Sequence, residues 1–355
     1  MSSAAQSSFD LSFHHISSID DLGWFLAVEG GPLGSGQRAA RVVAQSRSSW
    51  HVHDGTTVLH ARARSRSLDP RPVTGDWVVI SGTDDCLVES VLPRRTQLTR
   101  AEAGGRSAEQ VIAANVDVVA VCAPATQANP RRIERELTAI WSSGATPLVL
   151  LTKAETADDL DAVVGEIAAV CLGVDVIPVS SATGVGVEHV RAQTGHGRTL
   201  ALIGPSGVGK STLVNVLSHA EVLATAAVRS DGKGRHTTTS RHLVALPGGG
   251  LVLDTPGMRE FAPWADRDGL ASAFADVDEL AQRCRFSDCA HATEPGCAVR
   301  AAADADEVFA ARVDSWRRLQ REQAWLARRN DARLESAERK RWAAMVRSAR
   351  GSARP

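Results

Sequence analysis

The stretch GPSGVGKST combines glycines with a lysine and a hydroxyl at the spacing of a phosphate-binding loop. Backbone N–H groups can approach a β-phosphate there, the Lys210 ammonium can reach the β- and γ-phosphate oxygens, and the Ser211 hydroxyl can bind Mg²⁺. An apolar run precedes the motif and a helical pattern follows it, which is the context that it requires. We expect phosphates to contact Gly204, Pro205, Ser206, Gly207, Val208, Gly209, Lys210, Ser211 and Thr212.

A second pair of motifs would sense the metal ion and the γ-phosphate. The run LVLDTPG ends a strand in Asp254, with Gly257 three residues later. In this D-x-x-G arrangement the carboxylate approaches Mg²⁺ and a glycine N–H meets the γ-phosphate. The polar segment GKGRHTTTSRHL lies between the two motifs, and it predicts a Mg²⁺-binding hydroxyl that a γ-phosphate would order, from Thr237, Thr238 or Thr239.

The base-reading motif of ordinary GTPases, Asn/Thr-Lys-x-Asp, does not follow the phosphate loop. Upstream, the apolar run LVLLTKAE ends in Thr152, Lys153, Ala154 and Glu155, and PVSSATGVG offers backbone N–H groups of Ser180 and Ser181 to a guanine oxygen. The order of these motifs along the chain is therefore a circular permutation of the order in ordinary GTPases. Proteins tolerate such a permutation because domain termini often lie close together.

Three cysteines and one histidine crowd into fourteen residues near the C-terminus. Three thiolates and one imidazole suit a tetrahedral structural zinc site without an open position for catalysis. The other cysteines are scattered in apolar patterns, and we expect Cys86, Cys122 and Cys171 to be buried thiols. The predicted ligands of one zinc ion per chain are Cys284, Cys289, His291 and Cys297.

The elements that position these groups follow from the hydrophobic pattern. Short β-rich runs between residues 38 and 92 predict a small antiparallel barrel or sandwich. From Val116 onward strands alternate with amphipathic helices, the first beginning near Asn129, which predicts a parallel sheet covered by helices. Near the C-terminus, Trp316 and Leu319 are spaced to face one core. The predicted division is a mobile extension and linker (1–34), a barrel (35–98), a nucleotide domain (99–275) and a zinc-binding, basic helical domain (276–355).

Charge and composition limit the partners. Residues 312–355 hold twelve arginines and one lysine against five acidic residues, although the whole chain has a net charge of -1. A basic end on an acidic body predicts an anionic partner, the alternative being a solvated helix face. No run approaches membrane-spanning length and the start lacks the order of a signal peptide, so we expect a cytoplasmic protein without a membrane partner.

The sequence closely resembles the circularly permuted GTPases of small ribosomal subunit maturation, the RsgA or YjeQ family. The resemblance runs from about residue 35 to 300 and is carried by GDWV, VLPRRTQLTR, QVIAANVD, GPSGVGKST, GRHTTT, DTPGMREF and CRFSDCAHATEPGCAV. It implies an N-terminal OB-fold, a permuted GTPase domain and a C-terminal zinc-binding helical domain. It further implies a monomer that binds the small subunit and its rRNA with GTP·Mg²⁺ and leaves after hydrolysis.

Two positions bear on how well this chain would perform that reaction. The family usually ends its base motif in Asp, and Glu155 is one methylene longer, so we expect looser guanine binding. Met258 stands where many GTPases place a water-orienting Gln, which predicts slow intrinsic hydrolysis. The resemblance implies a catalytic role for His236, the alternative being a loop residue that touches RNA or solvent.

Six arginines lie in or just after the expected OB-fold and would suit an RNA-binding face: Arg62, Arg64, Arg66, Arg94, Arg95 and Arg100. Two other functions also fit the sequence. A P-loop ATPase or kinase would follow if Glu155 had lost guanine selection. A static RNA-binding assembly protein would follow if the nucleotide site were vestigial, although Lys210, Ser211 and Asp254 are all present.

Overall fold

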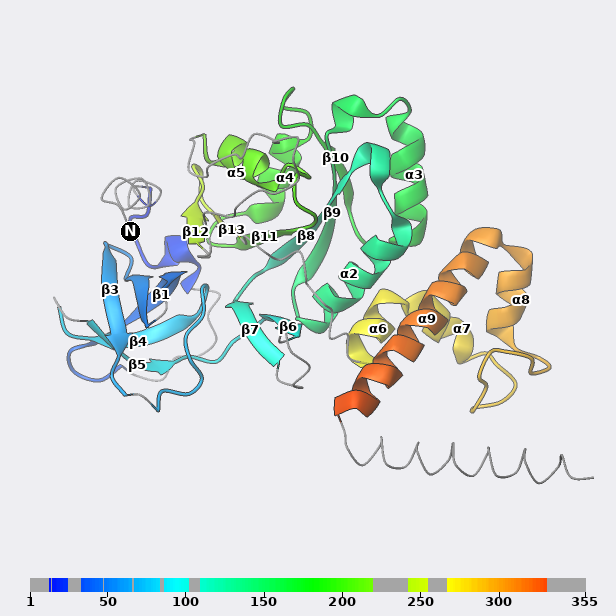
Figure 1. Cartoon of the computed structure of the whole chain (residues 1–355), viewed down its shortest axis with the longest axis horizontal. Coiled ribbons are helices and arrows are strands. Elements are labelled where there is room, and N and C mark those ends of the chain that lie inside the picture. The colour runs from blue at the N-terminus through cyan, green and yellow to red at the C-terminus, as the bar shows by residue number, and fades with distance from the viewer. Residues whose placement is uncertain are drawn as a thin grey trace, which may run out of the picture.

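The structure is a computed structural model that describes residues 13, 15–24, 33–46, 48–65, 67–83, 86–101, 109–219, 242–254 and 267–330. A β-barrel, a sheet covered by helices and a group of C-terminal helices lie in a row (Figure 1). None of the helices in these ranges is long and apolar enough to span a membrane.

The first β-rich region forms a closed five-stranded barrel, as predicted. Strand β1 pairs with β2 on one side and with β4 on the other, and β3 and β5 complete the ring. The pattern did not single out β2, because only Trp50 and Val52 of its residues are apolar; both lie in the barrel core. The strands are β1 (Gln37–Gln45), β2 (Ser49–His53), β3 (Val58–Ala63), β4 (Trp77–Ser81) and β5 (Cys86–Val91).

The central region has the predicted parallel sheet, in the order β10-β9-β8-β11-β13, with β12 antiparallel beside β13. Alternate residues of β8 enter different cores: Val119 packs with the helices α2 and α3, whereas Val118 packs with α4 and α5. The helices therefore cover both faces. The strands are β8 (Val118–Pro124), β9 (Thr146–Thr152), β10 (Val176–Val179), β11 (Thr199–Ile203), β12 (His242–Ala245) and β13 (Leu251–Asp254).

Local signals set the helix starts in this region. Helix α2 (Pro130–Ser142) begins after Asn129, whose side chain accepts the N–H of Arg132, and Pro130 occupies the first turn. Asp159 caps α3 (Leu160–Val170) in the same way. The other two helices are α4 (Val187–Thr194) and α5 (Lys210–Ser218), and short 3-10 turns lie at η3 (Ala125–Gln127) and η4 (Ala154–Thr156).

The barrel and the nucleotide domain share one eleven-stranded sheet. The connection is the antiparallel pairing of β1 with β12, where Ala44 lies opposite His242. On its other side, His242 lies opposite Asp254 of β13. The barrel is thus two strands away from the strand that carries the D-x-x-G motif.

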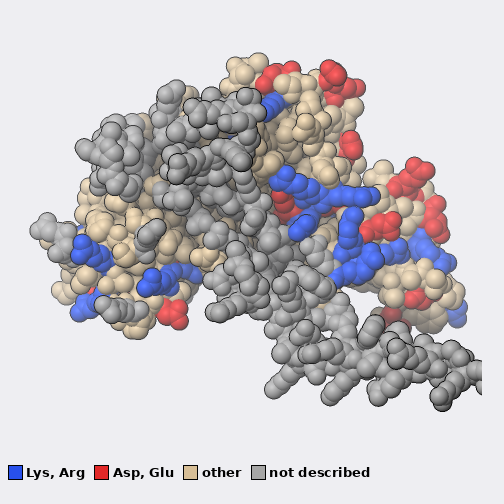
Figure 2. Space-filling view, viewed as in Figure 1, with Lys and Arg blue, Asp and Glu red and all other residues tan. Residues whose placement is uncertain are grey.

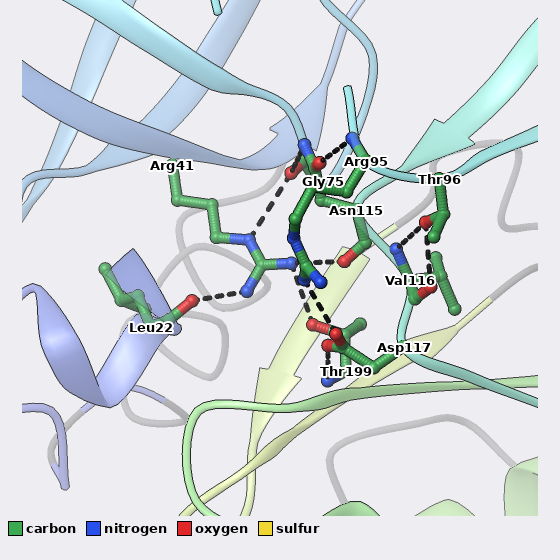
Figure 3. Close-up of polar contacts among 9 residues, drawn as sticks. All are labelled: Leu22, Arg41, Gly75, Arg95, Thr96, Asn115, Val116, Asp117 and Thr199. Carbon is green, nitrogen blue, oxygen red and sulfur yellow. Dashed lines mark hydrogen bonds and ion pairs between the residues drawn. The ribbon is translucent and has the colours of Figure 1, made fainter. Parts of the chain in front are cut away.

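Buried Arg41 makes a second connection, which we call the barrel junction (Figure 3). Its guanidinium donates to Leu22 O, to Asn115 O at 2.9 Å and to Thr199 Oγ1 at 2.8 Å, with a longer contact to Gly75 O. Burial lowers the pKa of Arg41 to about 10, so the side chain stays charged at neutral pH. One arginine of β1 therefore joins the barrel, the N-terminal segment, the interdomain connection and β11.

Part of the N-terminal segment packs against the domains, which differs from the expected mobile extension. The 3-10 turn η1 (Asp20–Leu22) buries Leu22 fully. Gly23 has φ +86°, and a Cβ there would lie 2.2 Å from Gly197 O, so only glycine permits this approach. A hairpin of β6 (Gln97–Ala101) and β7 (Glu109–Ala114) follows the barrel and was not predicted.

The C-terminal helices form a separate core that contains Phe274, Val277, Trp316 and Leu319. The prediction that Trp316 and Leu319 face one core is therefore confirmed. Arg312 fixes this core to the nucleotide domain. It donates to Val170 O of α3 at 2.8 Å and pairs with Asp276 at 2.7 Å. The helices are α6 (Arg267–Ala273), α7 (Ala275–Ala281), α8 (Ala298–Ala305) and α9 (Glu307–Asn330).

Candidate functional site

The predicted phosphate loop lies between β11 and α5, in the strand-loop-helix context that its motif requires. Lys210 begins α5, and its ammonium donates to Gly204 O and Pro205 O, both at 2.8 Å. These two carbonyls hold the lysine over the loop, where the positive end of α5 also points. The arrangement can bind an anion once Lys210 exchanges the carbonyls for phosphate oxygens.

Gly204 shows why the loop needs glycine. Its φ is +142°, and a Cβ there would lie 2.5 Å from the carbonyl oxygen of Cys122 in β8. The loop therefore rests directly on β8. The Cys122 thiol is buried as predicted, and this burial raises its pKa to about 12, so it is an inert packing group.

The two upstream motifs meet, although 25 residues separate Glu155 from Ser180. Strands β9 and β10 pair in parallel, with Thr152 opposite Val179, so the segments that follow them lie side by side. A hydrogen bond from the Ser180 side chain is the main cause that lowers the pKa of Glu155. The Ser180 Oγ also accepts the Thr183 N–H at 3.1 Å, so its proton is free to point at the carboxylate.

The surroundings hold this pair in place. Ser180 is 1% exposed and Thr152 is 4% exposed, and the Thr152 hydroxyl donates to Ala123 O of β8 at 3.2 Å. Lys153 adopts a left-handed backbone conformation, with φ +55°, at the start of η4. A carboxylate, Glu155, is thus presented at the sheet edge as an acceptor for hydrogen-bond donors of a ligand.

Five parallel strands end at the same edge of the sheet, and the motifs follow their carboxyl ends. The base motif follows β9, the serine segment follows β10, the phosphate loop follows β11, and Asp254 ends β13. In open parallel sheets this edge is where ligands bind. The structure therefore brings together the backbone of the predicted nucleotide site.

Several predicted site residues lie outside the described residues. They include His236, Thr237, Thr238, Thr239, Gly257 and Met258. For Asp254 the structure describes the backbone, which pairs with His242, but not the side chain.

The predicted zinc ligands come together. The ligand atoms of Cys284, Cys289, His291 and Cys297 all lie within 4.8 Å of one another. The Sγ atoms of Cys284 and Cys297 are 3.8 Å apart, and each is 3.5 Å from Nδ1 of His291. Tetrahedral zinc, with bonds of about 2.3 Å to sulfur and about 2.0–2.1 Å to nitrogen, would set these separations at about 3.8 and 3.5 Å. Cys284, His291 and Cys297 therefore have the separations of a tetrahedral zinc site, and the Cys289 sulfur lies within 4.8 Å of them, close enough to complete it with a small shift.

The C-terminal core supports this cluster. The His291 ring packs on Trp316 with ring centroids 5.6 Å apart, and Arg317 donates to the His291 carbonyl oxygen. The Cys297 Sγ also accepts the N–H of Arg300 at the start of α8. A bound metal ion would thus hold the segment before α8 against α9.

The arginines predicted to face RNA divide into two groups. Arg94 pairs with Asp76 at 2.8 Å and Arg95 pairs with Asp117 at 2.7 Å, so these two hold the barrel and its connection together. Arg64 pairs with Glu89 of β5 within the barrel and is itself exposed. Arg62 is exposed; the side chains of Arg66 and Arg100 lie outside the described residues.

A different set of basic side chains gathers over α2 and α9 on one face of the molecule (Figure 2). Periodicity alone could not place the two helices side by side, so the sequence did not reveal this face. The set, which we call the basic band, comprises the exposed Arg131, Arg132, Arg135, Arg318 and Arg321.

A family model described as RsgA GTPase matches residues 91–264. The small ribosomal subunit biogenesis GTPase RsgA of Streptomyces coelicolor is 44% identical over 312 residues, which cover 85% of each chain. RsgA 1 of Oceanobacillus iheyensis is 40% identical over 79% of this chain and 82% of its own.

Two solved structures share the fold. YjeQ from Thermotoga maritima superposes with a TM-score of 0.62 at 23% identity, covering 81% of this chain and 99% of its own. YloQ, described as a circularly permuted GTPase, gives a TM-score of 0.59 at 21% identity, covering 81% and 95%.

Proposed function

The chain belongs to the RsgA GTPase family, and we propose from that premise that it binds the small ribosomal subunit in late maturation and leaves when GTP is hydrolysed. One observation supports the nucleotide part most directly. Motifs that are far apart in the chain follow the carboxyl ends of neighbouring parallel strands. A GTP molecule lying along this edge would meet base-reading, phosphate-binding and metal-binding groups in turn.

In this proposal each motif has a separate role. Lys210 and the N–H groups of residues 204–212 hold the phosphates, and Ser211 and Asp254 bind Mg²⁺. Glu155 would accept the N1–H and amine of guanine, and Ser181 would present its N–H group to the guanine oxygen. The Ser180 N–H, which the sequence predicted for the same role, donates to Val185 O at 2.9 Å. Mg²⁺ would offset charge between the β- and γ-phosphates. Thr238, Gly257 and His236 would act on the γ-phosphate and the attacking water, as the family resemblance implies.

Ser180 fits this role for a reason specific to this chain. The Glu155 side chain has one more rotatable bond than Asp, which gives it more freedom to leave the guanine-reading position. The Ser180 side chain lowers the pKa of Glu155 and would restrain its carboxylate through a hydrogen bond. We infer that guanine selection survives the longer side chain because of this restraint.

The metal cluster would have a structural role. With zinc bound, Cys284, Cys289, His291 and Cys297 would fill all four positions and leave none for a substrate. The zinc would then stabilise the C-terminal core that Arg312 attaches to the nucleotide domain.

The basic band is the surface that best suits an rRNA partner. It crosses from the nucleotide domain to the C-terminal helices, and arginine binds phosphate groups through paired N–H donors. Arg94 and Arg95 are part-buried and paired with buried Asp76 and Asp117, so the barrel would contact rRNA through other residues. Arg132 of the basic band pairs with Glu136 but is itself exposed. We expect subunit binding to weaken as salt is added, because arginines that neutralise phosphates release counterions.

The test is phosphate release from GTP with and without purified small ribosomal subunits. We expect slow hydrolysis by the free protein, faster hydrolysis with subunits, and none above background for Lys210→Ala. Competition by ATP tests base choice in the same assay. Absence of turnover with subunits present would contradict the proposal, and equal hydrolysis of ATP and GTP would favour a P-loop ATPase.

A further inference from the structure

Phe286 is an exposed aromatic side chain in the segment that joins α7 to α8 and carries the metal cluster (Figure 1). Phe286 is 41% exposed, whereas Phe274 and Trp316 of the adjoining core are 1% and 6% exposed. Among the phenylalanines and tryptophans that the structure describes, it is the most exposed. An aromatic ring left in water forgoes the stability that burial would give it, so this position needs an explanation.

The backbone holds the Phe286 ring at a fixed place. Two residues of the metal cluster, Cys284 and Cys289, flank it in the sequence. The Phe286 carbonyl oxygen accepts the N–H of Cys289 at 3.3 Å, and the N–H of Arg285 donates to Gly296 O at 3.1 Å. A metal ion bound to both cysteines would restrain the segment further. A ring presented on such a segment loses little conformational freedom when it binds a partner.

A guanidinium lies beside this ring. The Arg285 Cζ is 5.5 Å from the centroid of the Phe286 ring, which is within the range of a cation–π contact. Gly296 leaves room for the arginine stem, since a Cβ at Gly296 would lie 3.1 Å from the Arg285 Cβ. Gly296 also has φ +74°, a conformation that favours glycine. The segment therefore displays an aromatic face and a positive charge together.

The charges around Phe286 favour an anionic partner. Arg283 and Arg285 are exposed, and Asp288 is the one acidic residue between positions 283 and 289. Glu294, later in the same segment, accepts three backbone N–H groups of that segment at 2.8–3.1 Å. Its negative charge is thus turned toward the backbone, and the surface beside the ring keeps a positive balance.

An unpaired nucleotide matches this pair of groups. Every base has a flat π face that stacks on an aromatic ring, and phosphate oxygens accept hydrogen bonds from arginine. Bases inside a duplex are already stacked on one another, so the ring can take only an unpaired base. An apolar protein partner would need apolar neighbours around Phe286, but the residues on either side of it are exposed Arg285 and Ser287.

We propose that Phe286 and Arg285 form a stacking platform for an unpaired base of the rRNA partner. This inference rests on the proposed function, and it differs from the role of the basic band. Arginines neutralise phosphates whether the bases are paired or not. Phe286 contributes only where a base is unpaired, so it makes binding sensitive to the local fold of the RNA.

The experiment measures binding of the full chain to fluorescein-labelled oligouridine, which is unstructured, and to an RNA duplex of the same length, by fluorescence anisotropy. Phe286→Leu keeps an apolar side chain but removes the π face, so oligouridine binding should weaken about 5- to 50-fold while duplex binding stays unchanged. Phe286→Trp keeps a π face and should bind oligouridine as the parent does. The matched control is Val308→Ala, which trims a 49% exposed residue of α9 and should change neither affinity.

The same variants are then titrated with purified small ribosomal subunits, and their metal content is measured. Phe286→Leu should bind subunits more weakly than the parent, Phe286→Trp should bind them equally well, and every variant should keep the parent's metal content. Loss of metal by Phe286→Leu would overturn the inference, because Phe286 would then support the cluster.

Three binding results would also overturn the inference. They are unchanged affinity of Phe286→Leu for oligouridine, equal weakening toward oligouridine and duplex, and weakening toward subunits alone, which would mean that Phe286 contacts a ribosomal protein. A parent chain that binds neither RNA nor subunits would overturn the proposed function and this inference together. A parent chain that binds subunits as well as Phe286→Leu does would overturn this inference alone.

Discussion

Replacing Arg41 with methionine should lower the free energy of unfolding by about 3–5 kcal/mol. Methionine fills the space of the arginine stem but donates no hydrogen bonds. Three buried acceptors of the barrel junction, Leu22 O, Asn115 O and Thr199 Oγ1, then lose their donor. Gly75 O keeps the Asn115 side chain as a donor at 3.1 Å, so it contributes little to the loss.

The magnitude follows from these three acceptors. Each buried acceptor left without a donor costs about 1–3 kcal/mol of stability. Removing the buried charge of Arg41 offsets part of this loss, because the charge no longer has to be desolvated. Arg41→Lys should lose less, because an ammonium keeps the charge and reaches some of the same acceptors. Because Arg41 joins four segments, methionine should also let the barrel unfold before the nucleotide domain.

The assay is urea denaturation followed by far-ultraviolet circular dichroism and by tryptophan fluorescence, since Arg41 lies 5.4 Å from the Trp77 ring. Arg62→Met, at an exposed position of the same barrel, is the control and should change stability by about 0.5 kcal/mol or less. If Arg41→Met lost less than about 1 kcal/mol, with the two probes still coincident, the barrel junction would not be what joins the domains.

Three further predictions concern the metal cluster, the base and the C-terminal contact. The protein should carry one zinc per chain by metal analysis, and Cys289→Ser should lose it together with protease resistance of the C-terminal helices; a purified chain without metal would contradict this. Glu155→Ala should erase the preference for GDP over ADP in titrations, whereas Glu155→Asp should tighten GDP by about 1 kcal/mol; an unchanged GDP-to-ADP ratio would refute the base-reading role. Arg312→Met should cost about 3–5 kcal/mol, because Asp276 and two carbonyls lose their hydrogen-bond donor and buried Glu134 loses a nearby charge, and a two-step melting curve should result; unaltered melting would contradict it.

Local signals explain which parts of the fold the sequence could predict. The cap at Asn129 and the glycines of the phosphate loop act on their neighbours, so α2 and the loop were found where expected. The Cys and His cluster was also predicted correctly, because its four residues lie within a stretch of fourteen in the sequence. Strand β2 was missed because it is only five residues long and has two apolar residues, Trp50 and Val52. The β6–β7 hairpin was missed as well.

Long-range contacts explain the rest. An arginine buried among backbone carbonyls has no sequence signature, so Arg41 was not predicted, and Arg94 and Arg95 were assigned to RNA although they hold Asp76 and Asp117. Leu22 sits in a polar segment, and its burial depends on Gly23 approaching Gly197.

The shared sheet has a geometric consequence for how this protein meets a large partner. A body held at one point can swivel in any direction, a body held at two points can turn only about the line between them, and a third point off that line stops rotation. The barrel is held by the chain at Asn115, by the β1–β12 pairing and by Arg41 against Thr199. Its distance from the phosphate loop is thus set within the free protein. A large partner that contacted both the barrel and the nucleotide domain would have to present its two contact sites at that spacing.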